Sequence, residues 1–130
     1  MGLTQFEEHS AYIDLELIDN AQGTGNLNIY RAAIPGRIDS LILASDDTVD
    51  HVLQLWAVQS GTPTALLGSV SVPAGSGTDG VLPSVDAIPL VFPTVLTFYF
   101  DNTYQLGVRV TVAVTAGKNL WVAAIGGYFY

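Results

Sequence analysis

The stretch Tyr104-Gln105-Leu106-Gly107-Val108-Arg109-Val110-Thr111-Val112-Ala113-Val114-Thr115 decides the fold class. Aliphatic residues occupy every second position from Leu106 to Val114, and small or polar residues fill the positions between them. Because side chains alternate between the two faces of a strand, this pattern predicts a long β-strand with one buried face. The turn-forming sequence Ala-Gly-Lys-Asn follows at 116–119, and a β pattern resumes over Leu120–Phe129. We therefore expect a carboxy-terminal hairpin.

Other short segments with a β pattern lie upstream, each bounded by Gly, Pro, Asn or Asp: 13–17, 27–33, 38–44, 49–58, 66–72 and 94–100. In the first of them Leu15 and Leu17 alternate with Asp14 and Glu16, so we expect the leucines on its buried face. About eight short strands predict an all-β, jelly-roll-like β-sandwich, with an immunoglobulin-like sandwich as the alternative. Essentially no helix is expected beyond one turn near 84–88, ended by Pro89.

The chain has 130 residues and shows no break in composition, so one domain over 1–130 is predicted. Residues 1–10 are polar and are expected to form a flexible amino-terminal arm. No stretch has the length or the flanks of a membrane anchor or a signal peptide. The absence of cysteine removes disulfides and thiolate metal sites from consideration.

Charge is unusually scarce and almost all of one sign. Charged residues make up 12% of the chain, about half of what is typical of soluble domains, whereas hydrophobic residues reach 49%. The net charge is −8, which argues against nucleic acid and against anionic membranes as partners. A surface rich in Ser, Thr, Gly and Asn is one explanation of the low charge. We favour the other, that part of the surface is covered by protein in the working state.

No catalytic apparatus is visible, so a non-enzymatic protein is expected. The two histidines, His9 and His51, have no nucleophile motif near them, and His51 is expected to face solvent from a strand. Asp46, Asp47 and Asp50 gather beside His51, but their spacing does not match a calcium loop. We therefore expect no metal and no cofactor. The glycine-rich segment 73–80 is interpreted as a long flexible loop and not as a dinucleotide site, because Pro83 interrupts any following helix.

Aromatic residues gather in two strands, at 98–100 and near the carboxy terminus. Neighbouring strand positions face opposite sides, so these side chains cannot all lie in one core. Tyrosine and tryptophan are enriched in interfaces, where they bury a large area at small entropic cost. The candidate protein-contact residues are therefore Tyr99, Trp121, Tyr128, Phe129 and Tyr130.

Several stretches together resemble small structural proteins of tailed bacteriophages: Pro35-Gly36-Arg37-Ile38-Asp39-Ser40-Leu41, Thr48-Val49-Asp50-His51-Val52-Leu53-Gln54-Leu55-Trp56, the segment 68–80 and the segment 108–127. The resemblance covers most of 33–128. It implies a virion protein, made in the host cytoplasm, of the decoration or cement type. Such proteins bind the outside of the capsid, contact the major capsid protein and often form trimers, so a homo-oligomer with a trimer favoured is expected.

Two other classes remain open at this point. A tail or baseplate subunit would form rings through head-to-tail contacts. A sugar-binding module would be a monomer with exposed aromatic platforms. The solution mass of the purified chain separates these expectations.

Overall fold

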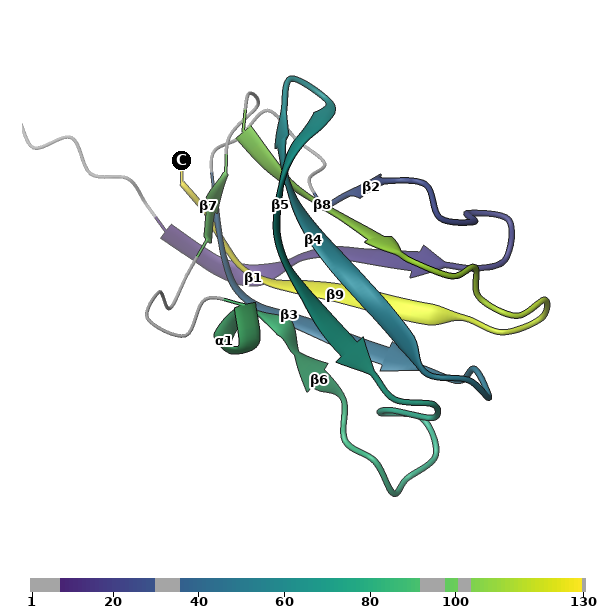
Figure 1. The fold of residues 1–130 in the computed structure, drawn as a ribbon. Helices are drawn as coiled ribbons and strands as arrows, with labels where there is room; N and C mark the ends of the chain where they lie inside the picture. The colour runs from purple at the N-terminus through teal and green to yellow at the C-terminus, as the bar shows by residue number, and fades with distance from the viewer. Residues whose placement is uncertain (1–7, 30–35, 92–97, 101–103, 130) are drawn as a thin grey trace, which may run out of the picture.

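The computed structural model describes residues 8–29, 36–91, 98–100 and 104–129. They form two antiparallel sheets packed face to face, with one short helix (Figure 1). The elements are β1 (Glu8–Ile18), β2 (Leu27–Asn28), β3 (Gly36–Ser45), β4 (His51–Gln59), β5 (Thr62–Val72), β6 (Val85–Asp86), α1 (Ala87–Val91), β7 (Phe98–Phe100), β8 (Tyr104–Val110) and β9 (Leu120–Phe129). The all-β prediction is confirmed.

The strand order is that of a jelly roll. Sheet A has the order β1-β9-β3-β6, with β7 also pairing with β3, and sheet B has the order β2-β8-β4-β5. Leaving β7 aside, the first strand pairs with the last, the second with the second-last, and so on inward to the β4–β5 hairpin. This nested pairing is the double Greek key of jelly rolls, so the jelly-roll-like prediction is confirmed as well.

The predicted carboxy-terminal hairpin is wrong. β8 pairs with β2 and β4 in sheet B, whereas β9 pairs with β1 and β3 in sheet A. The strand also ends at Val110, five residues earlier than expected, and the chain then crosses from one sheet to the other (Figure 1). Val112 is 66% exposed in this crossing and Val114 is buried again. Alternation identifies a strand and its faces, but it does not identify the partner strand.

The core lies between the two sheets and consists of aliphatic side chains from both. Sheet A contributes residues such as Leu41, Leu43 and Val122, and sheet B contributes residues such as Leu55 and Val108. All five are fully buried. Burial of such a side chain stabilises the fold by about 1.5–3 kcal/mol relative to leaving it in water. The alternation of these residues with exposed or half-buried neighbours is what the sequence predicts.

The helix begins later than predicted. α1 starts at Ala87, and Pro89 lies inside its first turn instead of ending it. A proline is tolerated there because the first turn has no intrahelical acceptors for its N–H groups. Asp86 caps the helix, since its Oδ1 accepts from the Ile88 N–H at 3.1 Å. No helix within the described ranges has the length and apolar character needed to cross a membrane.

The loop between β5 and β6, residues 73–84, is anchored and not free. The Ser45 N–H donates to the Ser76 carbonyl at 2.8 Å, and the Thr78 hydroxyl donates to the Ser45 carbonyl at 2.8 Å. The Ala74 N–H donates to Asp50 Oδ1 at 2.8 Å. The segment is a loop, as predicted, but these bonds tie it to both ends of the β3–β4 connection.

β1 begins at Glu8, inside the segment 1–10 expected to be an arm, and residues 1–7 lie outside the described ranges. His51 does not face solvent: it is 2% exposed and belongs to the interior of the loop end of the sandwich.

Candidate protein-contact surface

The outward side of sheet A carries apolar side chains in cross-strand rows. Leu17 on β1 lies opposite Trp121 on β9, which lies opposite Ala44 on β3. In the next row, Leu15, Ala123 and Ile42 are opposite one another. Ile125 follows in the third row. We call this set the outer apolar face: Leu15, Leu17, Ile42, Ala44, Trp121, Ala123 and Ile125.

The side of β1 that faces the core is the opposite of the side predicted. This orientation places Leu15 and Leu17 on the outer apolar face. Ile18 lies opposite Leu120, and both are fully buried. Because the pleat of paired strands is shared, Leu17 must then point away from the core together with Trp121. Leu15 is 50% exposed and Leu17 45% exposed, whereas Glu16 takes the inward side and is only half-buried. Alternation in β1 was correct, but the choice of the buried side was wrong.

The outer apolar face contains no charged residue, although the chain has a net charge of −8. Ile125 is 41% exposed, and the remaining members are half-buried: Ile42, Ala44, Trp121 and Ala123. Contiguous apolar patches on soluble domains are commonly interaction sites. Asp39 of β3, which pairs with Arg37 at 2.9 Å, directly precedes Ser40, the third-row partner of Ile125.

Of the five predicted contact residues, the structure places one on this surface. Trp121 lies at its centre, between Leu17 and Ala44. Tyr99 is in β7 opposite Arg37, Tyr128 is in β9 opposite His9 and Gly36, and Phe129 is opposite Glu8. The side chains of these three and all of Tyr130 lie outside the described residues. Sequence reasoning missed Leu15, Leu17 and Ile125, because it treated aliphatic residues in strands as core.

The outward side of sheet B differs, because its aromatic residue is already engaged. The Arg109 guanidinium carbon lies 4.2 Å from the ring centroid of Trp56, a cation–π contact. Gln54 joins the two: its Oε1 accepts from Trp56 Nε1 at 3.1 Å and from Arg109 Nε at 3.3 Å. One face of the Trp56 ring is therefore covered by the arginine and is not open for stacking on a sugar.

A buried polar network closes the loop end of the sandwich. Asp47 Oδ2 lies 2.7 Å from His51 Nε2 and accepts from the Thr115 N–H at 2.9 Å. Asp47 Oδ1 accepts from the Thr48 N–H at 2.6 Å, and the Asp47 N–H donates to the Ser45 hydroxyl at 3.1 Å. Burial alone raises the pKa of Asp47, but the bonds from Thr115, His51 and Thr48 outweigh it and hold that pKa well below the ordinary range.

This network fastens loops and does not present reactive groups. The contact with Asp47 uses Nε2 of the His51 ring, and Nδ1 lies on the other side of the ring. Nδ1 is buried and has no hydrogen-bond partner. Within the described part of the chain, no hydroxyl is therefore within hydrogen-bond reach of His51 to act as a nucleophile. The aspartates lie in the β3–β4 connection. Asp47, which is buried, links this connection to the β8–β9 connection.

The aspartates near His51 do not converge on a common point. Asp46 Oδ1 accepts from the Asn119 N–H at 2.7 Å, and Asp50 Oδ1 accepts from the Ala74 N–H. Asp46 thus holds the β8–β9 connection, and Asp50 holds the β5–β6 loop. Among the residues that the structure describes, no group of three His, Cys, Asp or Glu is placed to hold a metal ion.

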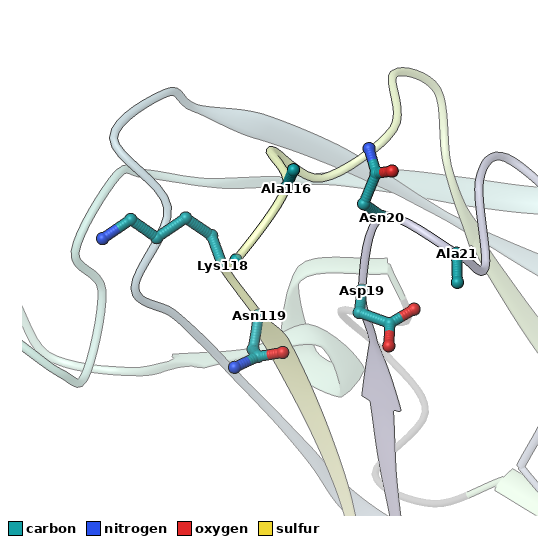
Figure 2. Close-up of a pocket in the computed structure, with 7 residues that line it drawn as sticks. Asp19, Asn20, Ala21, Ala116, Lys118 and Asn119 are labelled. Carbon is teal, nitrogen blue, oxygen red and sulfur yellow. The ribbon is translucent and has the colours of Figure 1, made fainter.

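One open hollow lies beside this network, with a volume of about 480 Å³. It is lined by Asp19, Asn20, Ala21, Ala116, Gly117, Lys118 and Asn119 (Figure 2). Asp19 accepts from the Gln22 N–H at 3.0 Å, and the Asn20 amide donates to the Val114 carbonyl at 2.8 Å. The side chains of Asp19 and Lys118 point away from each other in Figure 2.

Comparisons of the chain with protein-family models, with curated proteins and with solved structures find no match.

Proposed function

We propose that the protein is a non-enzymatic structural component of a phage particle, a decoration protein that docks on the outside of the capsid. In this proposal the outer apolar face of sheet A is the docking surface, with Trp121 at its centre and Leu15 and Leu17 beside it. The partner is the major capsid protein, and the docked protein stabilises contacts between capsomers.

The observation that carries the proposal is the lack of charge on a half-exposed sheet face. Leu15 and Leu17 keep about half of their surface in water. Covering the exposed half of a leucine side chain gains about 1 kcal/mol. Three such residues around a tryptophan give the usual composition of an interface core, in which aromatic residues are enriched and charges are depleted.

The charge distribution fits the same reading. Three acids lie next to this face: Asp19 and Asp46 come two positions after Leu17 and Ala44, and Asp39 precedes Ser40, which is opposite Ile125. An acidic rim would complement basic groups on a capsid and steer the encounter, while the apolar centre supplies affinity. Jelly rolls also occur in capsid and lectin domains, which is an analogy at the level of fold only.

The test is the location of the protein in purified particles of the phage that encodes it. Heads and tails are separated, and the protein is quantified in each by mass spectrometry. The proposal predicts many copies on heads. Heads from a phage that lacks the gene should rupture at a lower temperature than wild-type heads. Copies on tails alone would replace it with the tail-subunit alternative, and absence from both would reject a structural role.

A further inference from the structure

The loop between β5 and β6 carries an apolar turn, residues 79–82, that projects away from the two sheets (Figure 1). Val81 is 83% exposed, the highest value among the large hydrophobic residues that the structure describes, and Leu82 is 41% exposed. Neither side chain belongs to the described core between the sheets. Their apolar surface therefore stays in water unless a partner covers it.

Hydrogen bonds hold this turn in one shape. Asp79 Oδ1 accepts from the Val81 N–H at 2.8 Å and from the Leu82 N–H at 2.9 Å. The Leu82 carbonyl accepts from the Gly77 N–H at 2.8 Å, and Gly80 has a φ of 77°, a conformation that favours glycine. The bonds from Leu82 and Val81 also hold the pKa of Asp79 below its ordinary value, so this acceptor is ionised at neutral pH. A turn that is fixed before binding loses little conformational entropy when it docks.

The same loop borders the outer apolar face. Ser76 is fully buried, and its carbonyl accepts from the Ser45 N–H, so this part of the loop continues sheet A beside β3. The next residue, Gly77, lies against the outward side of β3, because a Cβ there would be 3.1 Å from the Cβ of Ala44. Ala44 belongs to the outer apolar face, and Gly77 bonds to Leu82. The turn is therefore adjacent to the rim of that face.

We propose that the turn 79–82 is a second contact of the docking surface, in which Val81 and Leu82 enter an apolar recess of the major capsid protein. This inference rests on the proposed function and adds a contact on the opposite side of β3 from Trp121. The partner follows from continuity, since a protein that covers Ala44 also reaches the adjoining turn. A second copy of the chain does not suit this role, because two chains of net charge −8 repel each other.

The two parts of the turn have different roles in this proposal. Val81 and Leu82 supply the apolar surface that is covered on docking. Asp79 is a positioning residue, because it fixes the backbone that presents the two side chains and stays outside the contact itself. Substitutions at the apolar tip and at the carboxylate therefore separate the two roles.

The experiment measures binding of the full chain to heads that lack the protein. Val81→Ser should bind about tenfold more weakly than the wild type, because it removes most of the apolar surface of the tip. Its stability should not change, since Val81 is 83% exposed. Val112→Ser is the matched control: Val112 is 66% exposed in the crossing after β8 of sheet B, and its replacement should leave head binding at the wild-type level.

Asp79→Ala and Asp79→Asn test the positioning role. Alanine removes the acceptor for both N–H groups, whereas the asparagine side chain keeps an oxygen in its place. Hydrogen exchange of the Val81 and Leu82 amides in the free protein should therefore be faster in Asp79→Ala and slow in Asp79→Asn. Head binding should follow the same order, with a loss of about threefold in Asp79→Ala and rescue in Asp79→Asn. Unchanged head binding by an Asp79→Ala variant with fast exchange would overturn the positioning role.

Leu17→Glu, measured in the same assay, separates this inference from the proposed function. Wild-type binding by Val81→Ser beside weak binding by Leu17→Glu would overturn the inference and leave the docking face standing. Wild-type binding by both variants would reject the docking face together with the inference. Binding of the chain to phosphatidylcholine vesicles that is lost in Val81→Ser, with head binding unaffected, would assign the turn to a membrane and would also overturn the inference.

Discussion

Asp47 Oδ2 lies 2.7 Å from His51 Nε2, and both side chains are fully buried. The same oxygen accepts from the Thr115 N–H, 68 positions away in sequence. One carboxylate thus connects the β3–β4 loop with the crossing from β8 to β9. A buried charge of this kind is tolerated because nearly every lone pair has a donor, and removal of the charge leaves those donors unpaired.

We therefore expect Asp47→Asn to lower the free energy of unfolding by about 3 kcal/mol, measured by urea denaturation. The matched control is Asp39→Asn. Asp39 is 39% exposed in its pair with Arg37, so its loss should cost less than about 1 kcal/mol. Equal effects of the two substitutions would show that the Asp47 network is not an anchor of the fold.

The low pKa of Asp47 also makes stability depend on pH. In the unfolded chain this carboxyl titrates near the ordinary value of about 4, whereas in the folded chain its pKa is held well below that range. The stabilisation is thus complete above about pH 4 and is lost as the pH falls toward the folded pKa, because the unfolded state takes up the proton first. The stability difference between wild type and Asp47→Asn should be constant above about pH 5 and should shrink as the pH falls from about 4 to 3. A difference that stays constant would contradict this account.

Among the glycines that the structure describes, Gly126 is the one where an added side chain would clash most closely with its neighbours. A Cβ at this position would collide with the backbone carbonyl of Arg37, where β3 has a register shift between Ile38 and Ser40. Because backbone cannot move aside cheaply, Gly126→Ala should destabilise the fold by about 4 kcal/mol or more. Gly25→Ala, whose nearest neighbour would be the Gln22 carbonyl at 3.4 Å, is the control and should remain close to wild type. Thermal denaturation of both variants measures the two stability changes.

The Arg109–Trp56 contact should contribute modestly to stability. Replacement of Arg109 by Gln removes the guanidinium from the ring and the bond to Gln54, and we expect a loss of about 1 kcal/mol in the free energy of unfolding. A double-mutant cycle with Trp56→Leu isolates the pair. A coupling energy indistinguishable from zero would mean that the stacking has no energetic role.

Most of the secondary structure follows from the sequence, because period-two alternation is a local signal. β3, β4 and β9 lie where the pattern places them, to within a few residues. Gly126 marks a close backbone approach, because a Cβ there would meet the Arg37 carbonyl. What alternation cannot supply is the partner of a strand. Strands β8 and β9 look like a hairpin because a turn-like sequence separates them, yet the nested pairing of the jelly roll sends them to opposite sheets.

The sequence predicts only part of the candidate surface, for a related reason. Trp121 was identified by residue type, but its neighbours Leu17 and Ile125 are aliphatic and resemble core residues in sequence. Which side of β1 faces inward depends on the pairing of Ile18 with Leu120, a contact between the two ends of the chain. His51 was misplaced likewise, since its burial depends on Asp47 and on the distant Thr115.

The central claim, that the outer apolar face docks the protein on a capsid, is tested most directly by binding of two variants to heads that lack the protein. Leu17→Glu places a charge on this face, and Val52→Glu places one on the opposite sheet at matched exposure, 45% against 42%. Both variants should remain folded by circular dichroism. We predict that Val52→Glu decorates heads with wild-type affinity and that Leu17→Glu binds at least tenfold more weakly. Full binding by a folded Leu17→Glu variant would contradict the claim.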